Sequence, residues 1–122
     1  MNDVVDDKKV QNAAKFADIE HLLLTSTEDT KGMHAGNEKT LSGGEKQRLS
    51  IARAIYADRE IIVLDELSSA LDKKTEADII QKLKGLKTKK TLLIVSHSKE
   101  MLAFCDVIFE MNAGTIKKIK SF

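Results

Sequence analysis

Two carboxylates and a histidine stand directly after short apolar stretches of this sequence. Asp65 and Glu66 follow the run 61–64, and His97 follows the stretch 91–96. Such short β-branched runs are typical of strands buried on both faces of a sheet. Open α/β sheets bind ligands at the carboxyl ends of their strands, which is where these three side chains would lie. Each of them alone is equally compatible with an exposed strand end or a surface histidine.

A serine followed by two glycines marks a second place where chemistry could occur. Ser42, Gly43 and Gly44 open a helical pattern, and Glu45 has the spacing of a capping box with Ser42. Two glycines at a helix N-terminus let backbone amides approach an anion closely, and the helix dipole favours negative charge there. Without their neighbours, the same residues would also fit a plain capped helix.

The helices and strands that must position these residues follow from the hydrophobic periodicity and from capping and turn residues. Residues 4–24 predict a helix with a break near Asp18, residues 25–41 a loop, and residues 42–57 a second helix. Strands are expected at 60–65 and 91–96, parallel and joined by a helix that Asp72 caps and that buries Ala77, Ile80, Leu83 and Leu86. A short helix over 98–104 and a hairpin of strands 106–111 and 115–119 complete the chain.

Four segments in this order resemble the C-terminal half of the nucleotide-binding domain of ABC transporters. They are the signature motif Leu41–Arg48, the Walker B strand Ile61–Glu66, the D-loop Ser69–Asp72 and the H-loop Ile94–His97. The resemblance implies an α/β fold, with an incomplete parallel sheet of a P-loop NTPase-like ABC ATPase core and an ABC helical subdomain. The helical subdomain would span residues 4–57 and the core residues 58–122, together one partial domain over 1–122.

The resemblance also implies roles for individual residues, with ATP and Mg²⁺ as cofactors. Asp65 would hold Mg²⁺, and Glu66 would act as general base on the attacking water. His97 would contact the γ-phosphate as the second catalytic residue. The nucleotide contacts made across a dimer interface would come from Ser42, Gly43, Gly44, Gln47 and Asp72. Asp72 is also a plain helix cap, and both roles can hold together.

One part of the family pattern is missing. No segment reads G-x-x-x-x-G-K-[ST], so the loop that cradles ATP phosphates is absent, and no glutamine fits the glutamine loop that would follow it. We therefore expect this chain alone not to hydrolyse ATP. In the family, the strand before the phosphate loop lies between the strand that ends at His97 and the strand that begins near Asp106. Without it, both strands are expected to expose an unpaired apolar edge.

Composition limits the partners and the location. The chain has 122 residues, a formal net charge of +1, and a single cysteine, Cys105, which we interpret as a small core residue in a reduced compartment. A balanced charge gives no reason to expect nucleic acid, and apolar runs of four or five residues predict no membrane insertion. The expected partners are a second nucleotide-binding domain, arranged head to tail, and a transmembrane transporter domain. The expected location is cytoplasmic, at the inner face of the cell membrane.

Three alternatives share part of this pattern. ABC-type translation factors carry a similar signature, but usually have Asn-His where this chain has Ser69 and Ala70. Chromosome-maintenance and repair ATPases have related motifs but need long coiled coils, which this sequence does not contain. A non-catalytic interaction fragment from a truncated gene would account for the absent phosphate loop, so that hypothesis stays open beside the transporter subunit.

Overall fold

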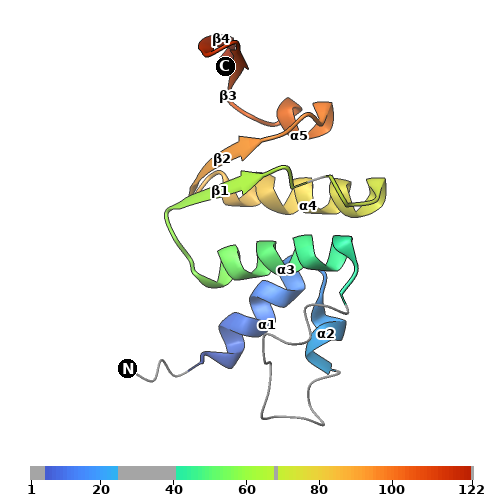
Figure 1. The fold of residues 1–122 in the computed structure, drawn as a ribbon. Helices are drawn as coiled ribbons and strands as arrows, with labels where there is room; N and C mark the ends of the chain where they lie inside the picture. Colours follow the sequence, from blue (N-terminus) through green and yellow to red (C-terminus); the bar gives the residue numbers. More distant parts are fainter. Residues whose placement is uncertain (1–4, 25–40, 68, 122) are drawn as a thin grey trace.

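A computed structural model describes residues 5–24, 41–67 and 69–121. Its elements, in order, are α1 (Asp7–Phe16), α2 (Glu20–Leu24), α3 (Gly43–Tyr56), β1 (Ile61–Asp65), α4 (Lys73–Leu86), β2 (Thr91–Val95), α5 (Lys99–Ala103), β3 (Val107–Asn112) and β4 (Thr115–Ser121). Figure 1 shows α1 and α2 at one end, α3 and α4 in the middle with β1 and β2, and the β3–β4 hairpin at the far end. The loop predicted over 25–41 lies outside the described residues, except for Leu41.

The helices begin and end within about three residues of the predicted bounds, with α1 starting at Asp7 rather than at residue 4. Side chains of Asp6, Ser42, Asp72 and Ser98 cap α1, α3, α4 and α5 by accepting a backbone N–H three residues on. Asp18 has a φ of 57°, in the left-handed region, which separates α1 from α2. The predicted break in the first helical segment is therefore confirmed.

The strands form two separate pairs. β1 and β2 are parallel, with Ile61 opposite Thr91 and Asp65 opposite Val95, as the βαβ pattern predicts. β3 and β4 form an antiparallel hairpin whose turn residues, Ala113 and Gly114, both have positive φ, as tight two-residue hairpin turns require. Within the described residues β2 pairs only with β1 and β3 only with β4. β2 and β3, the two strands expected to flank the missing strand, are therefore not paired with each other.

A single apolar cluster joins the helices to one face of the β1–β2 sheet. Its largest fully buried side chains are Ile51, Ile79, Leu83 and Met101, from α3, α4 and α5. The other buried members are Ala13, Ala14, Ala17, Ile19, Ala52, Ile62, Leu64, Leu67 and Ile80. Because this cluster includes residues of both α1 and α4, the helical segment and the βαβ unit share one core.

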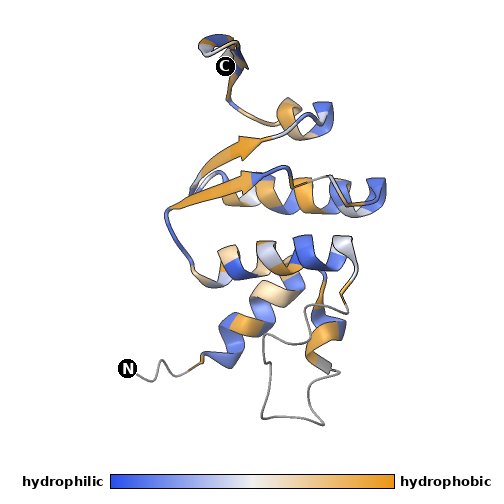
Figure 2. Cartoon of the chain, in the orientation of Figure 1, coloured by the Kyte–Doolittle hydropathy of each residue, from blue (hydrophilic) through white to orange (hydrophobic). Residues whose placement is uncertain are grey.

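The expectation that β1 and β2 are buried on both faces is wrong for this structure. Ile62 and Leu64 are buried, whereas Ile61 is 62% exposed and Val63 59% exposed. On β2, Leu93 is 57% exposed. Figure 2 shows both strands as strongly apolar along their length, although the described residues cover only the face toward the helices. Strands that are apolar on both faces are typical of a sheet covered on both sides, and the described residues cover only one side.

Two expectations about single positions are also corrected. Ala77 is exposed, and Ile79 occupies the buried side of α4 instead, so the expected apolar face is rotated by part of a turn. Cys105 is half-buried rather than a core residue, and its Sγ lies 3.6 Å from the carbonyl oxygen of Met101. Both positions lie at the margin of the apolar cluster, where sequence periodicity discriminates least.

Lysines of α4 and its C-terminal turn bind carbonyl oxygens at the ends of other elements. Lys82 Nζ donates to the carbonyl oxygens of Lys15 and Phe16, at 3.2 and 2.8 Å, at the C-terminus of α1. Lys87 Nζ donates to the carbonyl oxygen of Phe104 at 2.9 Å, just past α5. A cation at a helix C-terminus satisfies orphan carbonyls and complements the helix dipole. These contacts therefore fix α1 and α5 against α4.

Candidate functional site

Glu66 and His97 meet at the carboxyl end of the parallel strands. Glu66 Oε1 lies 3.4 Å from His97 Nε2, because parallel pairing of β1 and β2 brings both strand ends to the same edge. The His97 side chain is 95% exposed and that of Glu66 42% exposed. The pair is therefore open to solvent on the side where an open α/β sheet binds its ligand.

Asp65 ends β1 with an exposed side chain at the same edge. No cluster of three or more histidine, cysteine or acidic side chains able to hold a metal occurs in the described ranges 5–24, 41–67 and 69–121. Mg²⁺ in phosphotransfer sites is held by one or two carboxylates together with substrate phosphates, rather than by a complete cage of protein ligands. One exposed carboxylate beside Glu66 fits that mode, and the assignment of Asp65 stays a prediction.

Ser42 caps α3 with the full reciprocal arrangement that its spacing predicts. The Ser42 N–H and hydroxyl both donate to Glu45 Oε2 at 2.9 Å, and the Glu45 N–H donates to Ser42 Oγ at 3.2 Å. His21 Nε2 lies 3.3 Å from Glu45 Oε1, so α2 also contacts this end of α3. Gly43 and Gly44 form the first turn, where backbone N–H groups have no partner within the helix.

The hydrogen bonds from Ser42, the backbone one foremost, lower the pKa of Glu45 from 4.5 to about 2. Because the folded-state pKa is the lower one, the cap contributes fully above pH 4.5 and its contribution is lost as the pH falls toward about 2. We expect the side-chain carboxyl carbon of Glu45 to titrate in NMR well below those of exposed glutamates. The backbone amide signal of Ser42 should shift with the same midpoint. A Glu45 midpoint of 4 or more would contradict the capping box.

Gln47, one turn into α3, contacts the loop after β1 with its whole side-chain amide. Its Nε2 donates to the carbonyl oxygen of Glu66 at 3.1 Å and to Ser69 Oγ at 2.7 Å. Its Oε1 accepts from the backbone N–H of Ala70 at 3.1 Å. Gln47 thus links the start of α3, with Ser42–Gly44, to Glu66. The expected contact of Gln47 with nucleotide stays a prediction.

The backbone of Glu66 is in a strained conformation. Its φ is 49°, a left-handed value that costs a residue with a Cβ roughly 1–2 kcal/mol. The Glu66 N–H donates to the carbonyl oxygen of Val95 at 2.9 Å, and its carbonyl oxygen accepts from the Ser69 N–H at 3.2 Å. Strain of this kind is held in place by surrounding contacts and occurs preferentially at functional sites.

Asp72 serves as the N-cap of α4, as its position predicts. Its Oδ1 accepts from the Thr75 N–H at 3.0 Å and its Oδ2 from the Thr75 hydroxyl at 2.7 Å. These two bonds, the backbone one first, lower the pKa of the Asp72 carboxyl. With both oxygens engaged by Thr75, Asp72 fixes the start of α4 directly after the loop that Gln47 holds.

A buried carboxylate that the sequence did not reveal lies behind His97. Glu76 is 3% exposed, and its Oε1 accepts from the Ser98 hydroxyl at 2.6 Å. Lys73 Nζ lies 3.4 Å from the other oxygen of Glu76. Because Ser98 follows His97 and caps α5, Glu76 anchors the segment that carries the histidine. In the sequence, Glu76 is a glutamate on an otherwise apolar face of a helix, and hydrophobic periodicity alone does not predict that it is buried.

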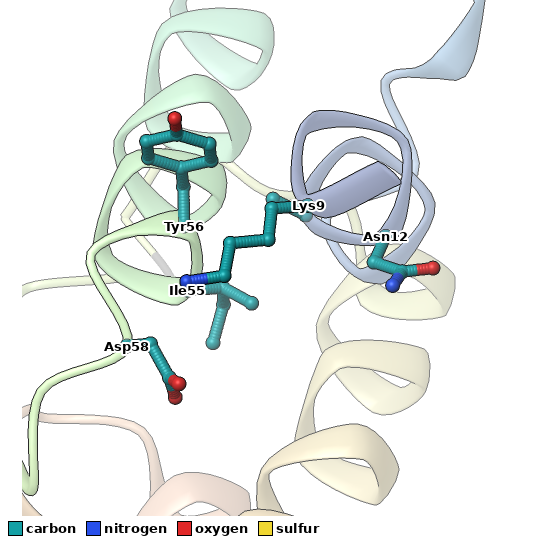
Figure 3. Close-up of a pocket in the computed structure, with 6 residues that line it drawn as sticks. Lys9, Asn12, Ile55, Tyr56 and Asp58 are labelled. Atoms are coloured by element: carbon teal, nitrogen blue, oxygen red, sulfur yellow. The ribbon is translucent and has the colours of Figure 1, made fainter. Parts of the chain in front are cut away.

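A shallow pocket of about 170 Å³ lies elsewhere on the molecule, between α1 and the C-terminal end of α3. Figure 3 shows Lys9 and Asn12 of α1 on one side and Ile55, Tyr56 and Asp58 on the other. Ser42 lies at the opposite end of α3. The pocket therefore shares no residue with the group formed by Ser42–Gly44, Gln47, Glu66 and His97.

Comparison with known proteins identifies the family. Residues 2–69, more than half of the chain, match the family model described as "ABC transporter". The chain belongs to the ABC transporter family. It is 42% identical over 115 residues to the probable multidrug resistance ABC transporter ATP-binding/permease protein YheI of Bacillus subtilis. It is 36% identical over 115 residues to the β-(1→2)glucan export ATP-binding/permease protein NdvA of Brucella abortus.

Solved structures of ABC proteins share the fold. A bacterial Atm1-family ABC exporter with ATP bound matches 89% of this chain with a TM-score of 0.76 and 30% identity. The dimeric bacterial ABC transporter cassette MJ0796 matches all of it, with a TM-score of 0.73 and 29% identity. The fold is therefore the α/β fold of an ABC ATPase cassette, with an incomplete core.

The matched regions are parts of longer proteins. The chain spans 19% of the length of YheI and of NdvA, and 52% of the MJ0796 cassette. None of the described helices is both long and apolar enough to cross a bilayer. The matches therefore concern an ATP-binding domain, and activities of the complete relatives reach this chain only as proposals.

Proposed function

We propose that this chain is the C-terminal half of the nucleotide-binding domain of an ABC exporter, where ATP hydrolysis drives transport across a membrane. The observation that carries the proposal is the Glu66–His97 pair, 3.4 Å apart at the carboxyl end of the parallel strands. Gln47 links this pair to the glycine-rich start of α3. A carboxylate general base and an anion-binding helix start are two parts that phosphoryl transfer requires.

The proposed roles rest on the resemblance to the ABC motifs, and the positions of the residues support them. Glu66 takes a proton from the attacking water, and His97, almost fully exposed, reaches the γ-phosphate. Asp65 would hold Mg²⁺, which would neutralise phosphate charge. Gly43 and Gly44 lie in the first turn of α3, where backbone N–H groups have no partner within the helix. In this proposal they bind the γ-phosphate of ATP on a second cassette. Ser42 and Asp72 border that interface.

The partners and the location belong to the same proposal. A second nucleotide-binding domain would pack head to tail, as the dimeric arrangement of the MJ0796 cassette supports. A transmembrane domain would couple through the helical part, residues 4–57, with residues 58–122 forming the ATPase core. ATP-binding/permease relatives place such domains together in one protein. The site would then lie at the cytoplasmic face of the membrane.

Turnover measurements test this proposal. The chain alone is expected not to hydrolyse ATP, because nothing in it positions the phosphates beside Glu66. In a protein that carries this chain together with a phosphate loop, Glu66→Gln should reduce ATP turnover at least about 100-fold, since it removes the base. Glu60→Gln, at an exposed position before β1, is the matched control. Turnover by the isolated chain, or full activity of Glu66→Gln, would refute the assignment.

A non-catalytic interaction fragment is the second candidate. The two candidates differ in what the chain does when a complementary half with a phosphate loop is supplied. An ATPase half should generate Glu66-dependent turnover in the combined protein. An interaction fragment should bind its partner equally well with Gln at position 66.

A further inference from the structure

We infer that Gln47 is a positioning residue that couples the anion-binding start of α3 to the backbone of Glu66. The inference rests on the proposed function, in which Glu66 is the general base. It gives Gln47 a role inside its own chain, where its amide groups are already engaged. The role is to hold the strained loop after β1 at a fixed distance from Gly43 and Gly44.

The hydrogen bonds of Gln47 engage the first residue of this loop and two residues further along it. One Nε2 hydrogen binds the Glu66 carbonyl oxygen and the other binds Ser69 Oγ, while Oε1 binds the Ala70 N–H. All three distances are 3.1 Å or less, and the side chain is half-buried. A side-chain amide offers two donors and one acceptor group, so only a glutamine of this length satisfies all three partners together.

The Glu66 backbone is thereby fixed from three directions. Its carbonyl oxygen accepts from Gln47 and from the Ser69 N–H, and its own N–H donates to Val95 of β2. Left-handed φ at a residue with a Cβ persists only where neighbours determine it. Without the Gln47 bond, the Glu66 carbonyl oxygen keeps only the Ser69 N–H as its partner. The backbone that carries the Glu66 carboxylate is then held less firmly in position beside His97.

The glycines supply an independent observation for the same coupling. A Cβ on Gly44 would lie 3.1 Å from the carbonyl oxygen of Ala70, and a Cβ on Gly43 would lie 3.6 Å from Ala70 Cβ. The first turn of α3 therefore packs against the loop at its closest approach. Gln47 bonds to Ala70 from the next turn, so the loop is held by contact from the glycines and by hydrogen bonds from the glutamine.

Hydrogen exchange at Ala70 tests the coupling in this chain without any nucleotide. Gln47→Met keeps side-chain length and helix propensity but removes all three bonds. We expect the Ala70 amide to exchange about fivefold to tenfold faster in Gln47→Met, the change that loss of one hydrogen bond produces. Gln81→Met, at an exposed position of α4, is the matched control and should leave Ala70 unchanged. Equal Ala70 exchange in the wild type and Gln47→Met would overturn the inference.

Steady-state turnover, with kcat and KM measured separately, tests the catalytic consequence in a protein that also contains a phosphate loop. Gln47→Met should lower kcat about tenfold or more, with the KM for ATP changed less than about twofold, because the Gln47 amide binds the loop of its own chain and, in this inference, not ATP. Gln47→Glu keeps the acceptor for Ala70 and regains a donor only when protonated. A glutamate has a pKa of about 4.3 and stays a carboxylate at neutral pH, so the kcat of Gln47→Glu should be lowered about as much as that of Gln47→Met.

The outcomes separate this inference from the proposed function. If Glu66→Gln abolishes turnover while Gln47→Met and Gln47→Glu match wild type in kcat and KM, the positioning role is wrong and the base assignment stands. If Glu66→Gln has no effect, the proposed function fails. The Ala70 exchange result still decides whether Gln47 holds the loop.

Discussion

Ser42→Arg is expected to abolish ATP hydrolysis in a protein that combines this chain with a phosphate loop, while leaving the fold of the chain almost intact. Loss of the cap costs about 0.5–2 kcal/mol of stability. Loss of a preorganised anion-binding position usually reduces turnover about 100-fold to 1000-fold, and an arginine side chain also fills the space that the γ-phosphate needs. Steady-state ATPase and urea unfolding of the same preparations measure the two effects.

Ser50→Arg is the control for this change. Ser50 is exposed on the same helix, two turns on, and its hydroxyl donates only to the carbonyl oxygen of Lys46 at 3.1 Å. An arginine there introduces the same charge away from the helix start, so turnover should remain near wild type. If Ser42→Arg retains wild-type turnover, the glycine-rich helix start does not contact the γ-phosphate.

Val63→Lys and Leu64→Lys are expected to affect different properties of the isolated chain, the first its self-association and the second its stability. Val63 is 59% exposed on the uncovered face of β1, whereas Leu64, the next residue, is 5% exposed in the core. Exposed apolar faces and open strand edges promote self-association. Val63→Lys should therefore lower self-association with little change in stability. Leu64→Lys should unfold the chain, because an unpaired charge in an apolar core costs several kcal/mol.

Sedimentation velocity over a range of protein concentrations measures the first effect, and circular dichroism the second. The wild-type chain should sediment with an average mass that rises with concentration, and Val63→Lys should remain closer to the monomer. A wild-type chain that is monomeric at all concentrations would show that the uncovered face and the unpaired edges of β2 and β3 do not recruit other chains. Equal stability of the two variants would contradict the assignment of the buried face.

Features that depend on a few neighbouring residues could be predicted from the sequence. The caps at Ser42 and Asp72 and the break at Asp18 follow from local hydrogen bonding and backbone preference. The meeting of Glu66 and His97 follows from one additional rule, that strands joined by a helix run parallel and end at the same edge. Both the parallel βαβ arrangement and the meeting of Glu66 with His97 were therefore accessible.

Features that depend on distant residues could not be predicted in this way. Val63 and Leu93 are exposed because no described element packs on their face of the sheet. The sequence of a strand does not show whether such an element is present. Gln47 reaches Ala70 across 23 positions in sequence, so no local pattern indicates its hydrogen bonds. Glu76 is buried because Ser98 supplies a donor from beyond β2, which only the packing of α4 against α5 shows.

The left-handed backbone of Glu66 has an evolutionary consequence. A glycine or asparagine at position 66 would relieve roughly 1 kcal/mol of strain and would fold more readily. A lineage selected only for folding or for partner binding would tend to lose the glutamate to such replacements by drift. Deep sequencing of position 66 after selection for folded chains, compared with selection for transport, should enrich glycine in the first pool and retain glutamate in the second.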